Sequence, residues 1–206
     1  MERKDKLVEV ALGEFIEKGY DKASLNNILK KAEISKGSFY YHFSNKQELY
    51  LYLFRIIHET EHKHLHEWRK ECTIDYEKLS FFEVLKLEGR VGVEAVIKYP
   101  KHYLFWKSMY EEKNPEVKVI IDKELKALIE SGHAEDYLMP LIEEGIKKKD
   151  FREDLSEEFI IRLLCDSMIT FFNCFVKEEK DFEVENLMRN YEEYVDFLER
   201  GLGKKK

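Results

Sequence analysis

The chain has few residues that break helices and no long apolar run. Its 206 residues include only 3 prolines and 9 glycines, so we expect few loops. No apolar stretch approaches the roughly 18 residues that a membrane span requires. The charged N-terminus leads into an amphipathic pattern and lacks the unbroken apolar segment of a signal peptide. We therefore expect a cytoplasmic protein that has no transmembrane helix and does not act at a membrane.

Cysteine is also scarce, with three residues and no spacing typical of a disulfide or zinc framework. Cys165 and Cys174 would lie about 13 Å apart along one helix, at 1.5 Å per residue, which is too far for a disulfide. We interpret the cysteines as small buried hydrophobic residues. A redox sensor is the alternative, although no basic residue beside them would lower a thiol pKa.

The composition is that of an ordinary globular protein, with 44% apolar and 37% charged residues. A net charge of −7 is unusual for a protein that binds nucleic acid. The charge is unevenly distributed, however, because residues 22–46 contain five lysines and a single acid. This local excess predicts a small positive patch, which a dimer would double.

Apolar residues recur with helical periodicity along nearly the whole chain, and no segment shows sustained alternation. We therefore predict an all-α fold. In the first helix Leu7, Ala11 and Phe15 follow one another at intervals of four residues, and Gly19 ends it. Ser24 caps a short second helix. The polar residues expected on its outward face are Asn26, Asn27, Lys30 and Lys31.

Residues 35–43 form the most informative run, Ser-Lys-Gly-Ser-Phe-Tyr-Tyr-His-Phe. Hydroxyl, phenol and imidazole groups crowd onto about two helical turns, which suits a helix that enters a DNA groove. Phe39 and Phe43 are the inward pair that would hold this helix against the core. Two short helices joined so tightly match a helix-turn-helix. A helical hairpin corner with exposed aromatic residues is the alternative.

The rest of the chain predicts longer helices. Ser44 to Gln47 have the spacing of a capping box and would open a helix that runs to about Lys70. Further helices are expected near residues 76–98, 101–113, 116–148 (with a break), 157–178 and 184–200. We divide the chain into a helix-turn-helix DNA-binding domain, residues 1–46, and a helical ligand-binding and dimerisation domain, residues 47–206.

One set of residues resembles a known family in order and spacing. It comprises Leu7, Ala11, Phe15, Gly19, Tyr20, Ile28, Ala32, the run 33–43, Lys46 and Leu49. This set resembles the DNA-binding domain of TetR/AcrR-type transcriptional regulators over about the first 50 residues. The resemblance implies a homodimer that binds a palindromic double-stranded DNA operator and acts as a repressor released by a small ligand. An activator or a ligand-independent regulator with the same DNA domain is the alternative.

The candidate DNA-binding residues are Ser24, Asn26, Lys36, Gly37, Ser38, Tyr40, Tyr41, His42 and Lys46. The resemblance implies that Tyr40 and Lys46 contact phosphates. It implies that the groups facing the major groove or its walls are Lys36, Gly37, Ser38, Tyr41 and His42. Gly37 would let the backbone approach DNA closely. Ser24, at a helix N-terminus, would present backbone N–H groups to a phosphate.

Two helices near the C-terminus are the candidate dimer surface, because the first of them is apolar on more than one face. The residues assigned to it are Phe159, Leu163, Phe175, Tyr191, Tyr194 and Leu198. An intramolecular core is the alternative for these residues.

A second aromatic cluster is a candidate pocket for a small apolar or aromatic ligand. Its residues are Phe82, Tyr103, Trp106, Met109, Tyr110 and Phe171. The same residues could instead fill the core, which is the commoner role of such side chains.

Four histidines, His58, His62, His64 and His66, lie on the predicted fourth helix. They alternate with charged residues, so we interpret them as a solvated helix face, with a metal or pH sensor as the alternative. We expect no metal and no cofactor. A helical metal-dependent enzyme is a further alternative, but the sequence offers no paired carboxylates and no nucleophile with an adjacent base. We therefore expect that the chain is not an enzyme.

Overall fold

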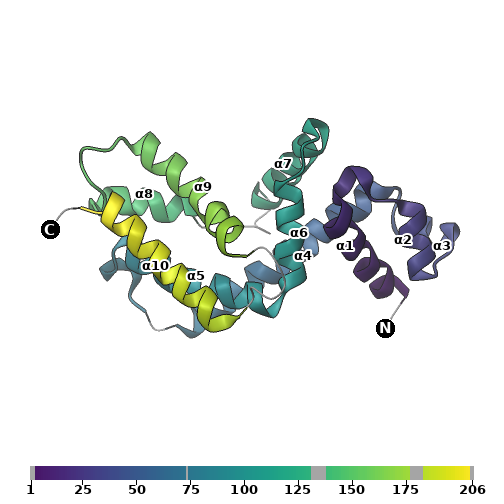
Figure 1. The fold of residues 1–206 in the computed structure, drawn as a ribbon, viewed down its shortest axis with the longest axis horizontal. Helices are drawn as coiled ribbons and strands as arrows, with labels where there is room; N and C mark the ends of the chain where they lie inside the picture. Colours follow the sequence, from purple (N-terminus) through teal and green to yellow (C-terminus); the bar gives the residue numbers. More distant parts are fainter. Residues whose placement is uncertain (1–2, 73, 131–137, 177–182, 205–206) are drawn as a thin grey trace. The chain divides into compact units, whose positions relative to one another are not determined.

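A computed structural model describes residues 3–72, 74–130, 138–176 and 183–204 of the chain (Figure 1). The helices follow in the order α1 (Arg3–Lys22), α2 (Leu25–Ala32), α3 (Lys36–His42), α4 (Lys46–Glu71), the 3-10 helix η1 (Tyr76–Lys78), α5 (Phe81–Lys98), α6 (Pro100–Tyr110), α7 (Pro115–Glu130), α8 (Leu138–Lys148), α9 (Glu157–Phe175) and α10 (Val184–Leu202). Within the described ranges there is no strand, only an isolated bridge between Phe151 and Gly203. The predicted all-α fold is confirmed. None of the described helices combines the length and the apolar character needed to cross a membrane.

The chain divides into two compact units. The first unit contains residues 1–62 and 101–134, and the second contains residues 63–100 and 135–206. The predicted domain boundary, between residues 46 and 47, falls at the start of α4. The predicted boundary divides the chain by function, whereas the two units divide it by contacts between residues. The boundary therefore stays a prediction.

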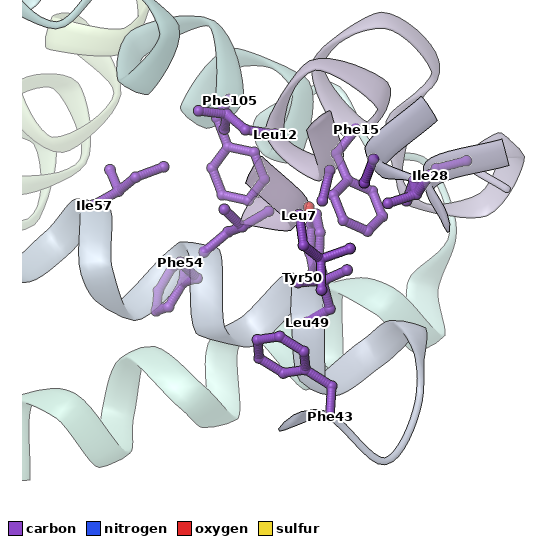
Figure 2. Packing of buried hydrophobic residues seen from close by; sticks show 14 of the residues in the cluster. Leu7, Leu12, Phe15, Ile28, Phe43, Leu49, Tyr50, Phe54, Ile57 and Phe105 are labelled. Atoms are coloured by element: carbon purple, nitrogen blue, oxygen red, sulfur yellow. The ribbon is translucent and has the colours of Figure 1, made fainter. Parts of the chain in front are cut away.

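The core of the first unit brings α1, α2, α3 and the first part of α4 together with α6 and α7. Phe15, Ile28, Phe39 and Tyr50 are almost fully buried in it. In Figure 2 the side chains beside Tyr50 are those of Leu7, Phe15 and Leu49, and Ile57 lies farther along α4. The ring of Tyr50 lies 4.9 Å from that of Phe15 and 5.2 Å from that of Phe105 on α6. The short helices therefore rest on one continuous apolar core.

Two left-handed residues shape the connections before α3. Gly19 has φ 69°, which interrupts α1 where the sequence predicts its end. Glu33 has φ 58° and ends α2, and the Ile34 N–H donates to the Leu29 carbonyl at 3.0 Å. A side chain at positive φ costs about 1–2 kcal/mol, so this tight turn holds Glu33 against its backbone preference.

Helix α4 begins at Lys46, as predicted, but its capping differs from the prediction by one residue. Asn45 is the residue whose side chain accepts a hydrogen bond from the Glu48 N–H, at 2.8 Å. Glu48 in turn accepts from the Ser44 N–H at 2.6 Å and from the Ser44 hydroxyl. The predicted capping box from Ser44 to Gln47 is therefore wrong in register, because Glu48 and not Gln47 supplies the carboxylate.

In the second unit α5 and α10 pack most extensively. A glycine makes this approach possible: a Cβ at Gly89 would lie 1.8 Å from the Tyr191 hydroxyl oxygen. That hydroxyl donates to the Leu85 carbonyl at 2.8 Å. Helices α8 and α9 also pack against each other, and α8 contacts α5.

The cysteines differ from their interpretation as buried hydrophobic residues. Cys174 is exposed, and Cys72 and Cys165 are half-buried; all three are free thiols. That interpretation is therefore wrong for Cys174, and the other two cysteines are only partly buried.

Candidate DNA-contacting surface

Helix α3 is held against the core by one face and leaves the other face open. Phe39 is fully buried and Phe43 is 3% exposed, and their rings lie 5.9 Å apart. Tyr40 and Tyr41 are instead 58% and 84% exposed. Two adjacent phenol rings exposed to this degree form an aromatic patch on the surface, and such patches are typical of contact surfaces.

The remaining residues of α3 share the open face. Lys36, Gly37 and His42 are exposed, and Ser38 is half-buried. A Cβ added at Gly37 would meet only the Ser35 hydroxyl, at 4.0 Å, so its surroundings within the protein are open. The His42 ring packs edge-on against Tyr41 with the ring centroids 4.9 Å apart. Hydroxyl, imidazole and ammonium groups thus point away from the core along one short helix.

Local hydrogen bonds explain why α2 and α3 begin where they do. The Ser24 hydroxyl accepts a hydrogen bond from the Asn27 N–H at 3.4 Å, and the Ser35 hydroxyl accepts one from the Ser38 N–H at 3.2 Å. Each cap satisfies an N–H group that has no partner within its helix. Ser24 and Asn26 are exposed at the N-terminus of α2, as expected for residues that face DNA.

Lys46 is engaged within the protein. Its ammonium donates to the carbonyls of Tyr20 at 2.7 Å, of Ala23 at 3.1 Å and of Asp21 at 3.4 Å. It also lies 4.4 Å from the Tyr20 ring centroid. Burial lowers the pKa of Lys46, and the carboxylates of Asp21 and Glu112 oppose that shift. Lys46 therefore ties the start of α4 to the end of α1, a role that the predicted phosphate contact did not include.

Two of the four polar residues expected on the outward face of α2 contact Glu14 of α1. These are Asn27, which is half-buried, and Lys31, which stays exposed beyond its contact; Asn26 and Lys30 are exposed. Glu14 is only 1% exposed and is absent from the predicted site. Its position, one residue before Phe15 in the buried stripe of α1, was the available signal, because a charged residue there needs partners.

The candidate pocket residues fall in both units. Tyr103 and Met109 are buried in the first unit, and Phe82 and Phe171 are buried in the second. The side chain of Tyr110 lies outside the described residues. The burial of these four side chains agrees with the core alternative, and the pocket assignment stays a prediction.

Trp106, the remaining pocket candidate, lies beside the carboxylate of Glu61. Its indole N–H donates to both carboxylate oxygens of Glu61, at 3.0 and 3.1 Å. Burial raises the pKa of Glu61 to about 7, although this hydrogen bond opposes the shift. The Trp106 ring also packs edge-on against Phe54 and His58, at 5.2 and 4.9 Å.

The histidines of α4 do not form one solvated face. Burial, and then the nearby His62, lower the pKa of His58 to about 4, so its ring is neutral near pH 7. The solvated interpretation is therefore wrong for His58, which packs on Trp106 because both lie on the inner side of the first unit. Among the described residues no cluster of three or more potential ligands could hold a metal ion.

The predicted dimer residues separate into two groups. On α9, Phe159, Leu163 and Phe175 are 50%, 38% and 41% exposed. Tyr191 and Leu198 on α10 are buried within the second unit, where they fill the core of a single protomer. Their assignment to a dimer interface is therefore wrong. Tyr194 is partly buried, and its hydroxyl donates to the Ser167 carbonyl at 2.6 Å.

Helix α10 nevertheless carries an exposed aromatic residue that the sequence analysis missed. Phe197 is 72% exposed. The apolar stripe of Leu187, Tyr191, Val195 and Leu198 follows the helical period and is buried. Phe197 falls outside that period, and this was the signal that could have identified it.

The loop between α6 and α7 contacts α1 within the first unit. The Asn114 amide donates to both carboxylate oxygens of Asp21, at 3.0 and 2.9 Å. Glu112, in the same loop, accepts from the N–H groups of Lys113 and Asn114. This loop therefore rests on the last turn of α1, next to the carbonyls that Lys46 binds.

A family model and two curated relatives match the chain in sequence. Residues 7–53 match the family described as "Bacterial regulatory proteins, tetR family". The HTH-type transcriptional regulator QacR of Staphylococcus aureus is 33% identical over 120 residues, covering 55% of this chain and 62% of that protein. The biofilm operon icaADBC HTH-type negative transcriptional regulator IcaR of Staphylococcus epidermidis is 49% identical over 47 residues, covering 23% of this chain and 25% of that protein. The chain thus matches less than two thirds of the length of either relative.

Solved structures share the fold over nearly the whole chain. A TetR family transcriptional regulator from Chloroflexus aurantiacus has a TM-score of 0.64 at 22% identity and covers 98% of this chain and 94% of its own. The transcriptional regulator FadR from Bacillus subtilis, in complex with stearoyl-CoA, has a TM-score of 0.69 at 18% identity and covers 96% and 98%. At these identities the likeness establishes the fold. All the proteins named here are regulators, in agreement with the expectation that the chain is not an enzyme.

Proposed function

We propose that this chain, a member of the TetR family of bacterial regulatory proteins, is a homodimeric transcriptional repressor that a small ligand releases from its operator. The observation that carries the proposal is the division of α3 into a buried face and an open face. Phe39 fixes the helix to the core, while Tyr40 and Tyr41 remain exposed beside Lys36. Because the helix is anchored before DNA arrives, little ordering entropy is lost on binding.

Each group on α3 has a partner in double-stranded DNA. The Tyr40 hydroxyl suits a phosphate oxygen, and the Lys36 ammonium suits the O6 and N7 acceptors of guanine in the major groove. Because Gly37 has no side chain, its position leaves room for a base edge or a phosphate. Ser24 and Asn26 at the start of α2 would contact the backbone on one side of the groove.

Dimerisation would place two copies of α3 in successive major grooves. A two-fold symmetric dimer recognises a palindromic site with half-site centres about 34–36 Å apart, one turn of DNA. The exposed apolar residues of the second unit, Phe159, Leu163, Phe175 and Phe197, support a surface that a second copy covers. A dimer also compensates for the small positive charge of a single DNA-binding domain.

The ligand would release the protein from its operator through a change in the first unit. Helix α6 carries Phe105 and Trp106 against α4, and the loop after it holds Asp21 through Asn114. A ligand that binds better to a different position of α6 would shift the DNA-binding helices with it. Moving the population from mostly competent to mostly incompetent requires a difference in ligand affinity of about 5 kcal/mol. The FadR neighbour is in complex with stearoyl-CoA, so this fold can hold a ligand with a long apolar chain.

The experiment that tests the proposal selects operator fragments from the source genome and places the best one before a reporter gene. We expect lower reporter expression when the chain is present and recovery in the Tyr40→Ala variant. Val119→Ala serves as the control, because Val119 is an exposed apolar residue on α7 (66%) rather than on α3. Higher expression in the presence of the parent would favour an activator, and no dependence of operator binding on any added ligand would favour a ligand-independent regulator.

A further inference from the structure

A charged residue lies at the interface between α1 and α2, where an apolar one would ordinarily pack. The side chain of Glu14 is 0% exposed. It accepts hydrogen bonds from Lys18 at 2.6 Å, from Lys31 at 2.9 Å and from the Asn27 amide at 2.9 and 3.0 Å. Both carboxylate oxygens are therefore satisfied, and two ammonium groups are held at one buried carboxylate.

Such an arrangement is not needed to hold two short helices together. A buried carboxylate loses its hydration, and its ion pairs often only balance that cost, so an apolar residue of similar size is frequently as stable. The distinctive consequence of Glu14 concerns charge. It fixes the ammonium groups of Lys18 and Lys31, whose side chains are 33% and 51% exposed and would otherwise extend into solvent.

Lys31 belongs to the lysine-rich region, residues 22–46, and Lys18 lies just before it. Of the five lysines in residues 22–46, Lys46 is bonded to backbone carbonyls and Lys31 is paired with Glu14. Lys30 and Lys36 are exposed and form no ion pair with a described residue. Lys30 precedes Lys31 on α2 and is also exposed but is not paired with Glu14, which makes the two residues a natural comparison.

We propose that Glu14 is a specificity-determining residue of the DNA-binding surface, because its buried contacts with Lys18 and Lys31 keep two positive charges from DNA phosphates. The inference rests on the proposed DNA-binding function. Phosphate attraction is independent of sequence and dominates non-specific binding, whereas contacts with base edges distinguish the operator. Withholding two cations therefore weakens binding to non-operator DNA more than binding to the operator. Glu14 acts through the lysines and does not touch DNA.

The test compares operator and non-operator duplexes at a series of salt concentrations for the Glu14→Gln variant. Glutamine retains the shape and an acceptor for Asn27 but releases the two lysines. We expect the plot of log affinity against log salt to become steeper by about 1–2 per protomer, since each phosphate contact contributes about 0.9. Affinity for non-operator DNA should rise by more than affinity for the operator. A merely structural role would lower both affinities and would not steepen the plot.

Glu17→Gln is the matched control. Glu17 lies on the same helix and is exposed, and its substitution changes the net charge by the same amount. If Glu14→Gln and Glu17→Gln alter the salt dependence and the non-operator affinity equally, the inference is overturned. A general effect of net charge would then explain the result.

A second pair of variants keeps the inference testable if Glu14→Gln does not fold. Lys30→Gln should reduce the salt slope by about 0.9, whereas Lys31→Gln should reduce it by clearly less because Glu14 already holds the Lys31 ammonium. Equal reductions in the two variants would contradict the role of Glu14 while leaving DNA binding itself intact. A parent chain that binds no duplex at any salt concentration would instead contradict the proposed function.

Discussion

The Gly37→Ala substitution should separate the stability of α3 from its fit to DNA. The added Cβ would lie 4.0 Å from the Ser35 hydroxyl and near no other atom, so the free protein accommodates it. Replacing glycine by alanine within a helix stabilises it by about 0.5–1 kcal/mol. Because Gly37 is the second residue of α3, we expect the lower part of that range. Thermal unfolding should therefore show an equal or slightly higher melting temperature.

Operator affinity should change in the opposite direction. If the backbone at Gly37 lies against DNA, the methyl group displaces α3 and impairs at least one contact with a base. A good base contact contributes about 1–3 kcal/mol, and each 1.4 kcal/mol corresponds to a tenfold change in affinity. We therefore expect the operator affinity to fall by about tenfold to a hundredfold, measured by fluorescence anisotropy with a labelled duplex.

Gly13→Ala is the matched control for this prediction. Gly13 lies within α1, is exposed and has no neighbour within 4 Å of an added Cβ. It should stabilise the protein without changing operator affinity. If Gly37→Ala binds the operator as tightly as Gly13→Ala does, the backbone of α3 does not approach DNA closely and the reasoning is refuted.

The remaining predictions concern stability, pH and assembly. Lys46→Ala should lower the free energy of unfolding by about 1–3 kcal/mol, because three carbonyls lose a donor; an unchanged denaturation midpoint would contradict the internal role of this lysine. Glu61→Gln should gain stability over the parent as pH rises: the pKa of Glu61, about 7 when folded, is above its unfolded value near 4.3, so the parent loses stability as its carboxyl ionises between these values. The unfolding free energy of Glu61→Gln minus that of the parent, measured by chemical denaturation, should be about 2 kcal/mol larger at pH 8 than at pH 5. An equal difference at both pH values would argue against a raised pKa of Glu61. Gly89→Ala should destabilise the second unit by several kcal/mol, since its Cβ would overlap Tyr191, and a melting temperature equal to the parent's would count against this packing. Phe197→Glu should leave the protomer folded but shift the mass measured by light scattering from dimer to monomer; a dimer mass would exclude Phe197 from the interface.

Where periodicity and capping chemistry agreed, the sequence was sufficient to predict local structure. Phe39 and Phe43 were expected inward, and both are buried. The Ser24 and Ser35 caps and the break at Gly19 were also found where predicted. Short helices with strong caps are determined by neighbouring residues, so they can be inferred without knowledge of the tertiary structure.

Residues whose partners lie far away in the sequence could not be placed in this way. Glu14 binds Lys31 across 17 positions, and Lys46 binds the Tyr20 carbonyl across 26. From sequence alone an ammonium group on a helix is equally suited to a phosphate, a carboxylate or a backbone carbonyl. For α10 the apolar stripe that suggested an interface is buried within the unit, whereas the exposed Phe197 stands outside the stripe.

The most direct test of the central claim, that the open face of α3 binds operator DNA, is the operator affinity of Tyr40→Ala measured by anisotropy beside the parent and Val119→Ala. Tyr40 is 58% exposed and donates no hydrogen bond to a described residue, so its removal should leave the melting temperature unchanged. We expect Tyr40→Ala to bind operator and non-operator duplexes at least tenfold more weakly, because a hydrogen bond to a charged group contributes about 1.5–3 kcal/mol and about 1.4 kcal/mol is tenfold. Operator binding by Tyr40→Ala as tight as that of Val119→Ala would contradict the claim.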